Sequence, residues 1–335
     1  MIFIMPELRL NLITREWVII ATERAKKPDY FIQKGNKKIS PDFLETCPFC
    51  PGNESKTPDE IMRIPHNGGW QVRVIPNKFA ALSSEGQRIR SNEGLKHCVS
   101  GVGKHEVIIE SPAHNIPPAL LSVDHIAEVL RTYRERFIDV YRSPFVKHVI
   151  IFKNQGEASG TSIIHPHSQL IGTPVTPLQV RDRISEARRY FDHTGECMMC
   201  SSLKDERTDG RRVILDTEHF TTFVPYAALS PFHTWIFPKR HHAAFGDIHD
   251  EEIPDLAHHL KTILSQFYYG LENPDFNFVI RSECPKESEC DYFHWYLSIV
   301  PRVSRSSGFE LGSGMYTNPS IPEEIAEFLR KVKIR

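Results

Sequence analysis

Apolar residues follow two different spacings along this chain, and the two spacings predict a mixture of strands and helices. Short runs rich in valine, isoleucine and aromatic residues predict strands, and they fall at residues 17–21, 106–110, 148–152, 220–224, 234–237, 277–280 and 296–300. Apolar positions at helical spacing predict helices, at residues 126–140, 179–191 and 253–267. A fourth helix is expected after Pro322, because proline suits a first helical turn. The pattern indicates an α+β protein.

The same order of features occurs twice, which favours duplication of one α+β unit over a chance coincidence. The first half contains Cys47-Pro48-Phe49-Cys50, Val74-Ile75-Pro76-Asn77, His114, a helix and His165. The second half contains Cys197-Met198-Met199-Cys200, Phe223-Val224-Pro225-Tyr226, His241, a helix and His294. We therefore expect an N-terminal half at residues 1–175 and a C-terminal pseudo-repeat at 195–335. The two halves would form one composite sheet or two tightly joined lobes.

The charge balance and the cysteine content narrow the class of protein. A formal net charge of −1 gives no electrostatic reason to expect nucleic acid or membrane partners. The apolar opening 1–5 is short and is followed by Glu7 and Arg9, so it does not resemble a secretory signal. A cytoplasmic location is expected. An odd count of seven cysteines without such a signal argues against a disulfide framework.

Each half carries two cysteines and two histidines, the usual ligands of a closed tetrahedral zinc site. The predicted ligands are Cys47, Cys50, His114 and His165 in the first half, and Cys197, Cys200, His241 and His294 in the second. Four protein ligands predict structural zinc without a catalytic role. Redox-active pairs are the alternative, without a clear strand-to-helix context. His233 and His242 compete with His241, which best matches His114 in the repeat.

The segment His165-Pro166-His167-Ser168-Gln169 is the strongest indication of catalysis. In an extended backbone His165, His167 and Gln169 would share one face. His165 is explained as a metal ligand, whereas His167 has no counterpart in the second half, where Tyr296 stands in its place. An imidazole that is present in only one of the two repeats is what we expect of a protein with a single active site. The alternative is a buried histidine with a purely structural role.

These motifs together resemble the galactose-1-phosphate uridylyltransferase family of the histidine-triad superfamily. The resemblance runs from residues 24–28 to Phe309-Glu310 and includes His165-Pro166-His167-Ser168-Gln169. It implies duplicated histidine-triad-like units with a mostly antiparallel sheet and flanking helices. It also implies a homodimer that exchanges UMP between UDP-glucose and galactose 1-phosphate through a covalent uridylyl-histidine intermediate. The expected partners are therefore a UDP-sugar and a hexose 1-phosphate.

The resemblance also implies the roles of individual residues. His167 would be the nucleophile and Gln169 would contact the phosphoryl oxygens. The remaining substrate-binding residues would be Arg24, Lys27, Asn77, Lys78, Asn154, Gly160, Thr161, Ser162 and, near the hexose, Glu310. A neutral imidazole can attack the α-phosphorus and divide one displacement into two. The small residues of the 156–162 loop allow backbone N–H groups to approach phosphate oxygens closely.

Two other functions remain open at this point. The segments His294-Trp295 and 308–314 are also similar to ADP-glucose phosphorylase, so an ADP-sugar or dinucleoside-polyphosphate phosphorylase using the same histidine is the alternative. Pro166 departs from those relatives, which tend to have a small polar residue there. The alternative from another class is a zinc-stabilised binding protein without catalysis. His167 beside Gln169 argues against it, because structure alone requires neither residue.

Overall fold

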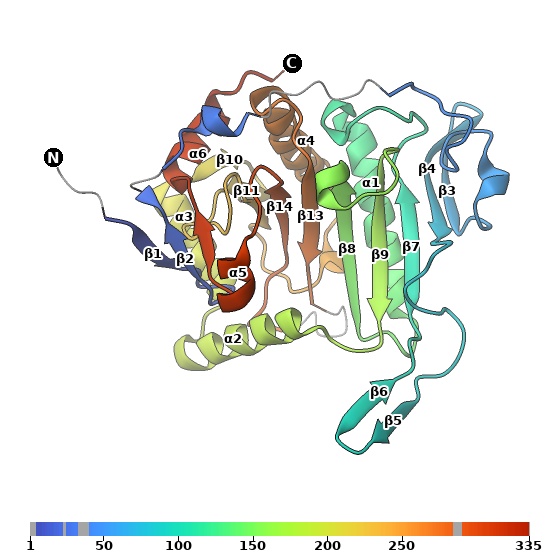
Figure 1. Cartoon of the computed structure of the whole chain (residues 1–335), viewed down its shortest axis with the longest axis horizontal. Helices are drawn as coiled ribbons and strands as arrows, with labels where there is room; N and C mark the ends of the chain where they lie inside the picture. Colours follow the sequence, from blue (N-terminus) through green and yellow to red (C-terminus); the bar gives the residue numbers. More distant parts are fainter. Residues whose placement is uncertain (1–4, 23–24, 33–39, 284–289, 335) are drawn as a thin grey trace.

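One antiparallel sheet runs through the whole molecule (Figure 1). The computed structural model describes residues 5–22, 25–32, 40–283 and 290–334. In spatial order the sheet contains β10 (Val213–Asp216), β11 (Phe220–Phe223), β12 (Thr234–Pro238), β14 (Tyr296–Pro301), β13 (Phe276–Arg281), β8 (His148–Gln155), β9 (His167–Thr173), β7 (Lys104–Ile109), β4 (Gly69–Pro76) and β3 (Met62–His66). Neighbouring strands are antiparallel throughout. The expected α+β class with a mostly antiparallel sheet is confirmed, and the composite-sheet alternative is the correct one.

The sheet is symmetric about the junction between β8 and β13. Phe152 of β8 pairs with Val279 of β13 at this junction. Phe152 also pairs with Gln169 of β9, and Val279 pairs with Ser298 of β14. Because directly paired residues of antiparallel strands point to the same face, these four side chains form one row across the sheet. Counted outward from the junction, the strands run β8, β9, β7, β4, β3 on one side and β13, β14, β12, β11, β10 on the other, so both halves have the same strand order.

Two long amphipathic helices cover one face of the sheet. Helix α1 (Val123–Tyr141) packs against β8, β9 and β4, and helix α4 (Ile253–Gly270) packs against β11 and β12. The two helices also contact each other. The Ser122 hydroxyl accepts a hydrogen bond from the backbone N–H of His125, which caps α1. Residues of both halves, from Leu130 to Phe267, share one hydrophobic core.

The remaining elements surround the other face and the ends of the sheet. The helices are α2 (Leu178–Thr194), α3 (Met198–Asp209), α5 (Gly308–Ser313) and α6 (Pro322–Lys331). The strands β1 (Glu7–Leu10), β2 (Trp17–Ile20) and β15 (Tyr316–Asn318) form a small separate sheet, and β5 (Arg90–Glu93) with β6 (Lys96–Val99) forms a hairpin that projects from the body (Figure 1). Among the residues that the structure describes, no helix combines the length and apolarity needed to cross a lipid bilayer.

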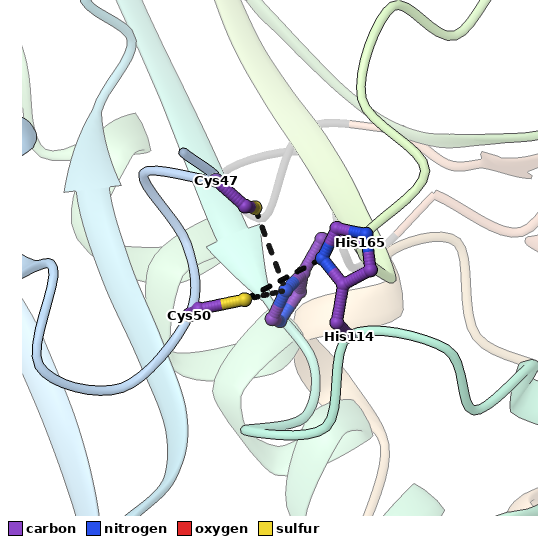
Figure 2. Close-up of side chains that lie close together, drawn as sticks. All are labelled: Cys47, Cys50, His114 and His165. Carbon is purple, nitrogen blue, oxygen red and sulfur yellow. Dashed lines mark hydrogen bonds between the residues drawn. The ribbon is translucent and has the colours of Figure 1, made fainter. Parts of the chain in front are cut away.

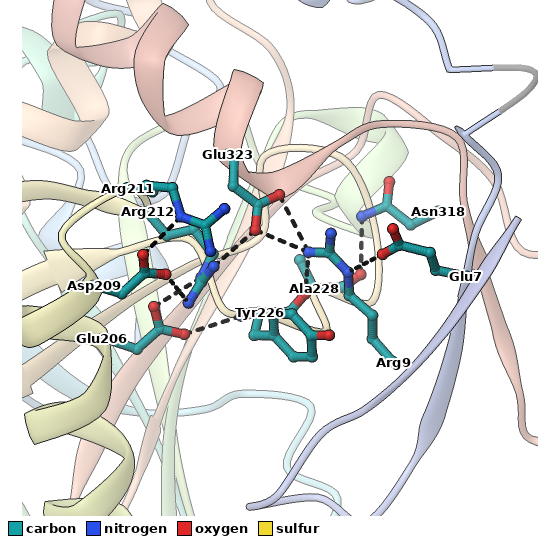
Figure 3. Close-up of polar contacts among 10 residues, drawn as sticks. All are labelled: Glu7, Arg9, Glu206, Asp209, Arg211, Arg212, Tyr226, Ala228, Asn318 and Glu323. Carbon is teal, nitrogen blue, oxygen red and sulfur yellow. Dashed lines mark hydrogen bonds and ion pairs between the residues drawn. The ribbon is translucent and has the colours of Figure 1, made fainter. Parts of the chain in front are cut away.

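A network of charged side chains attaches the N-terminal strand β1 to the second half (Figure 3). The carboxylate of Glu323, in the first turn of α6, accepts hydrogen bonds from Arg9 at 3.0 Å and from Arg212 at 2.7 Å. Arg212 also donates to Glu206 of α3 at 2.8 Å. The guanidinium of Arg9 lies over the ring of Tyr226, 4.4 Å from its centroid. The N-terminal segment therefore packs against residues that follow α2.

The expected elements are present, and the structure adds several that their sequences do not reveal. Each of the seven predicted strands and four predicted helices is found, with ends shifted by a few residues. Helix α3 begins directly after Cys197, at a segment for which no helix was expected. It follows helix α2 after a short turn, so the Cys197/Cys200 pair still lacks the strand-to-helix setting of a redox motif.

Candidate active site and metal centres

The four predicted metal ligands of the first half lie together and are buried (Figure 2). Their ligand atoms all lie within 4.8 Å of one another. The Cys50 Sγ is 3.4 Å from Nδ1 of His114 and 3.6 Å from Nδ1 of His165. The Cys47 Sγ is 3.8 Å from the same Nδ1 of His165. Two sulfurs and two imidazole nitrogens converging at such distances fit a tetrahedral zinc ion.

The surroundings of His165 favour the protonation state that metal binding needs. Its Nε2–H donates to the backbone carbonyl oxygen of Ser111 at 2.7 Å, which leaves Nδ1 directed at the cysteines. Burial lowers the pKa of His165 to about 4, so the imidazole is neutral at neutral pH. Burial also lowers the pKa of His114. Neutral imidazoles are the forms that coordinate metal ions.

The second half brings Cys197, Cys200, His241 and His294 together in the same way. The Cys200 Sγ lies 3.2 Å from Nδ1 of both His241 and His294. His233 and His242, the competing histidines, are not members of this cluster. Two of the four ligands, Cys200 and His241, are only half-buried, and a wide cavity opens beside them. The second centre is therefore more accessible than the first.

His167 is the first residue of β9, and its ring is held in a definite orientation. Its Nδ1–H donates to the backbone carbonyl oxygen of His165 at 2.8 Å, which leaves the Nε2 lone pair available for attack. The ring packs edge-on against Phe49, with 5.3 Å between centroids. Burial and the nearby Lys153 ammonium lower the pKa of His167, although the His165 carbonyl and Glu110 oppose the shift. A neutral, oriented imidazole is the form required of a nucleophile.

The expectation that His165 shares the strand face of His167 and Gln169 is corrected by the position of β9. The strand begins at His167, and His165 lies in a bend before it. Proline has no N–H to donate to a strand ladder, so Pro166 separates the metal ligand from the strand. His167 and Gln169, two residues apart in β9, do share a face.

Gln169 is positioned by a histidine of the neighbouring strand. The Gln169 Oε1 lies 2.8 Å from Nε2 of His105 on β7. The backbone N–H of Ala81 donates to Nδ1 of His105 at 3.1 Å, so Nε2 carries the proton and donates to Gln169. The Nδ2 of Asn77 lies 3.0 Å from the same Nε2. The carboxamide of Gln169 therefore has its oxygen engaged, and its NH2 group remains to hold a phosphoryl oxygen.

A buried polar network lies directly behind His167. The Lys153 ammonium donates to Glu110 Oε2 at 2.7 Å and to the backbone carbonyl oxygen of His167 at 3.0 Å. The hydroxyl of Tyr133 on α1 donates to Glu110 Oε1 at 2.6 Å, and Ser168 donates to the same oxygen. Lys153, Glu110 and Ser168 are almost completely buried. The network holds the His167 carbonyl oxygen and the side chain of Ser168, and so fixes the chain directly after the His167 Cα.

The small-residue loop after β8 is attached to the second half. Gly156 has φ +84°, and a Cβ at this position would lie 1.9 Å from Oδ1 of Asp275. Asp275 accepts a hydrogen bond from the backbone N–H of Ala158 at 2.8 Å. Further along the loop Gly160 has φ +90° with open space where a Cβ would stand. Thr161 is half-buried and Ser162 is exposed. The loop therefore presents its polar groups outward at the sheet surface.

The other predicted substrate-binding residues are spread more widely. Asn154 accepts a hydrogen bond from Asn277 of β13 at 2.8 Å and lines a cavity that Glu310 of α5 also lines. His167 and Gln169 do not line this cavity. Lys27 and Lys78 are exposed. Arg24 lies outside the residues that the structure describes.

Comparison with known families shows which family the chain belongs to. The N-terminal domain of galactose-1-phosphate uridyl transferase matches residues 2–177, and the C-terminal domain of the same family matches residues 183–299. The chain belongs to this family. The resemblance inferred from the motifs is therefore confirmed, and the protein is a member of a family of nucleotidyl-transferring enzymes.

Individual members of the family differ in their specificity. The chain is 36% identical to an ADP-glucose phosphorylase of Arabidopsis thaliana, over 98% of this chain and 93% of the relative. It is 30% identical to a galactose-1-phosphate uridylyltransferase of Haemophilus influenzae, over 97% of this chain and 94% of the relative. The crystal structure of the Arabidopsis thaliana ADP-glucose phosphorylase with bound ADP-glucose superposes with a TM-score of 0.81 at 33% identity, covering 98% and 99% of the two chains.

Sequence reasoning missed three side chains that this family member places at its site. His105, Glu110 and Lys153 all contact the His167–Gln169 segment, through either a side chain or the backbone. The position of His105 has one signal in the sequence, because it stands where His233 stands in the second half. Glu110 and Lys153 have no such signal, since a lone charged residue in a strand more often faces solvent.

Proposed function

We propose that this protein transfers a nucleoside monophosphate from a nucleotide sugar to a phosphate-bearing acceptor through a covalent bond to His167. The single observation that supports the proposal most is the His167 ring itself. Its Nδ1–H is engaged with the His165 carbonyl oxygen at 2.8 Å, and its Nε2 stands beside Gln169 on the strand face. In this family member we assign the donor as UDP-glucose and the acceptor as galactose 1-phosphate.

The reaction balances in two displacements. In the first, Nε2 of His167 attacks the α-phosphorus, an N–P bond forms, and the P–O bond to the β-phosphate breaks, so glucose 1-phosphate leaves with the electron pair. In the second, a phosphate oxygen of galactose 1-phosphate forms a new P–O bond, and the P–N bond breaks to release His167. A phosphate leaving group needs little protonation, which suits a carboxamide such as Gln169 in place of an acid.

The surrounding residues would bind and orient the nucleotide. The NH2 group of Gln169 would hold a non-bridging oxygen of the α-phosphate while charge develops on it. Asn154, Gly160, Thr161 and Ser162 would line the phosphates, and Asn77, Lys78 and Lys27 would lie along the nucleotide. We keep Arg24 in the same group and Glu310 near the hexose, although Arg24 lies outside the described residues. Because Glu310 lines a cavity that His167 does not line, it would have to approach the reacting groups from outside that cavity.

A second candidate is an ADP-glucose phosphorylase that uses the same His167. The observation that favours it is the 36% identity with the Arabidopsis thaliana relative, against 30% with the Haemophilus influenzae uridylyltransferase. The two functions share the first displacement and differ in the base of the donor and in the acceptor. A dinucleoside-polyphosphate phosphorylase would differ from the ADP-glucose phosphorylase only in its donor.

The experiment that separates them uses donors labelled at the α-phosphorus. Purified protein is mixed with labelled UDP-glucose or ADP-glucose, denatured, and tested for covalent label. Labelled protein is then exposed to galactose 1-phosphate or inorganic phosphate, and the released nucleotide is identified. Labelling by UDP-glucose with release by galactose 1-phosphate supports the main proposal. Labelling by ADP-glucose with release by phosphate supports the second. No covalent label from either donor would leave the zinc-stabilised binding protein as the better account.

We further propose that both metal centres hold structural zinc. The ion would neutralise the cysteine thiolates and fix the segments that carry its ligands, with no position left for substrate. In the first half the ligand His165 lies two residues from the nucleophile. Metal binding there would supply rigidity to the turn that aims His167, and the transfer chemistry would be carried by the side chains described above.

Three broader expectations also stand as proposals. We propose a homodimer, which the exposed apolar side chains of α5 support, since Leu311 is 83% exposed and Phe309 is 49% exposed. We propose division of the chain at the 1–175 and 195–335 boundaries. We propose the cytoplasm as its compartment, because its cysteine-based metal centres require reduced thiols. Light scattering at micromolar concentration tests the dimer, and a monomer there would contradict it.

A further inference from the structure

A cavity of about 330 Å³ lies on the open face of the sheet in the second half. Its floor is formed by alternate residues of β13 and β14, including Val279, Arg281, Tyr296 and Ser298. Because Val279 belongs to the same row of side chains as Gln169, this floor is continuous with the face that carries the nucleophile. His167 and Gln169 do not line the cavity, but Asn154 and Glu310, which we assign to the nucleotide phosphates and the hexose, both do.

The floor of the cavity is the second half's equivalent of the nucleophile's surface. Gln169 pairs with Phe152, and Ser298 pairs with Val279 in the corresponding register. Two residues further along these strands, Tyr296 takes the place of His167, and its strand partner Arg281 takes the place of Asn154.

The histidine contact of the first half is repeated as well. In the first half His105 contacts Gln169, and in the second Nε2 of His233 lies 2.9 Å from the hydroxyl of Ser298. The supporting polar pair has therefore been retained, while the nucleophile has been replaced.

Two guanidinium groups line this cavity without a carboxylate at ion-pair distance among the described residues. Arg281 of β13 and Arg183 of α2 both line it, and neither forms an ion pair with a carboxylate of the described residues. The Arg183 Nε is buried and has no hydrogen-bond partner, and its Nη1 reaches only the Gln179 carbonyl oxygen at 3.2 Å. Burial and the charge of Arg183 lower the pKa of Arg281, while Tyr296 and Glu16 oppose the shift. The pair is therefore arranged at an electrostatic cost that a bound anion would remove.

The rim adds further positive charge. Arg302 and Arg305 also line the cavity, whereas the carboxylate of Glu310 is the acidic group that lines it among the described residues. Glu310 Oε2 already accepts hydrogen bonds from the backbone N–H of Ser307 at 2.8 Å and from its hydroxyl at 2.5 Å. A small cavity lined by more cations than anions favours a ligand with two negative charges.

We propose that the second half binds a phosphate monoester in this cavity, between Arg183 and Arg281, and does not transfer it. Guanidinium groups bind phosphate through paired N–H donors, and two of them line this cavity. The hydroxyl of Ser298 and the ring of Tyr296 lie on the same floor and provide further polar contacts. A cavity of this volume is large enough for a sugar phosphate. With tyrosine in place of the nucleophile, the site binds its ligand as an accessory site of the enzyme.

The test uses inorganic phosphate and glucose 1-phosphate as probes, with the full-length zinc-loaded protein. Binding is followed by calorimetry and by the fluorescence of Trp235, which lines the cavity. We expect Arg281→Met and Arg183→Met each to weaken binding at this site about tenfold or more, since each removes a charge-assisted pair of donors. Arg281→Lys should weaken it as well, because an ammonium cannot form the paired contact.

Two matched controls separate the cavity from the nucleophile and from general charge effects. Arg181→Met removes an exposed arginine of the same helix that does not line the cavity, and it should leave binding unchanged. Gln169→Ala perturbs the nucleophile's surface and should also leave binding at Arg281 unchanged. Labelling of His167 by nucleotide sugar should persist in Arg281→Met, because neither Arg281 nor Arg183 is assigned to the nucleotide, so this variant tests the phosphate site without removing a residue of the first displacement.

A stability measurement distinguishes a ligand site from a structural role. Without phosphate, Arg281→Met should melt at the same or a higher temperature than the natural protein, because the repulsion from Arg183 is removed. Phosphate should raise the melting temperature of the natural protein and not that of the variant. A folded Arg281→Met that binds phosphate as well as the natural protein, or one that loses stability in phosphate-free buffer, would overturn the proposal.

Discussion

The ammonium group of Lys153 donates a hydrogen bond to the backbone carbonyl oxygen of His167 at 3.0 Å. The same ammonium pairs with Glu110 at 2.7 Å, so a buried ion pair stands directly behind the nucleophile. A buried pair of this kind is weak evidence for stability as such, because desolvation offsets most of the attraction. Its location indicates a different role, which is to fix the backbone from which the His167 ring projects.

Replacing Lys153 by methionine should be strongly destabilising. The change leaves the Glu110 carboxylate buried without its cation, and breaking a buried pair in this way costs about 3–5 kcal/mol. The pKa of Glu110, which Lys153 holds below its ordinary value, should rise as a result. Urea denaturation measures the loss.

The matched control for that variant is Lys147→Met, which removes an exposed lysine and should change stability by less than about 0.5 kcal/mol. Removing both charges in Lys153→Met/Glu110→Leu should restore part of the stability but not the rate of His167 labelling. Full recovery of both would show that the ion pair has no positioning role.

Alanine substitutions of His165 and His167 should have different effects on labelling, zinc content and stability. His167→Ala should abolish covalent labelling while the protein stays folded and keeps its zinc, since His167 is not a member of the metal cluster. His165→Ala should lose zinc and stability together. Gln169→Ala should slow labelling about 10²-fold, as expected when one donor to a developing charge is removed. Persistent labelling of His167→Ala would contradict the assignment of the nucleophile.

Zinc removal should distinguish the two metal centres. Elemental analysis should give roughly two zinc per chain. The first cluster is buried on all four ligands, whereas the second is half-exposed beside a wide cavity. A chelator should therefore remove one zinc rapidly and the other slowly, and Cys197→Ser should eliminate the rapid phase. Cys98→Ser, at an exposed cysteine outside both clusters, should change neither phase. A metal-free protein of unchanged stability would contradict structural zinc.

Acidification should destabilise the fold through histidines far from the metal centres. Burial lowers the pKa of His259 to about 4 and that of His148 to about 4. Because the unfolded imidazole has the higher pKa, near 6.5, this stability is complete above about pH 6.5 and is lost as the pH falls towards 4. A tenfold weaker affinity of the folded imidazole for its proton corresponds to about 1.4 kcal/mol of stability.

Melting temperature measured between pH 7 and pH 4.5 tests this expectation. His259→Asn should flatten the profile, because the titrating group that hydrogen-bonds Thr217 at 2.7 Å and Thr222 at 2.6 Å is gone. His249→Asn, at an exposed histidine, is the control and should retain the natural slope. A profile in His259→Asn as steep as that of the natural protein would assign the acid sensitivity to other groups.

Two glycines of the loop after β8 should differ in how well they tolerate a side chain. Gly156 has φ 84° and ψ 162°, a conformation open essentially to glycine alone, and a Cβ there would lie 1.9 Å from Asp275, whereas Gly160 is in the left-handed helical region with open space around it. We expect Gly160→Ala to cost about 1 kcal/mol and Gly156→Ala clearly more, because Asp275 must also shift. Thermal unfolding of both variants measures the difference. Equal costs would contradict both the greater backbone strain at Gly156 and the clash with Asp275.

The parts of the fold predicted from the sequence are those whose physics is local. Helices α1 and α4 have continuous apolar stripes, and the central strands are rich in valine and isoleucine, so spacing alone identifies them. The hairpin of β5 and β6 is almost entirely exposed, and helix α3 is mostly polar, so neither has a clear apolar pattern. Their structure depends on turns and on contacts that the spacing of apolar residues does not reveal.

The site shows the same division between local and long-range information. The spacing of cysteines and histidines predicted both metal clusters, because the repeat supplies each ligand with a counterpart. The contacts of His105 with Gln169 and of Lys153 with Glu110 join residues far apart in sequence. They arise from strand pairing, which one sequence does not specify. Glu310 was expected near the hexose from the resemblance; it lines the cavity of the second half together with Asn154, and its contact with a hexose stays a prediction.

The hydrogen-bonded pairing of Phe152 with Val279 also restricts how this enzyme can move. Many enzymes enclose their substrates by swinging two lobes together about a hinge. Here the two halves meet as adjacent central strands of a continuous sheet, so such a swing would have to break the ladder between β8 and β13. Exclusion of water from the transfer reaction must then depend on shorter segments over the open face, such as the loop at 156–162 and helix α5.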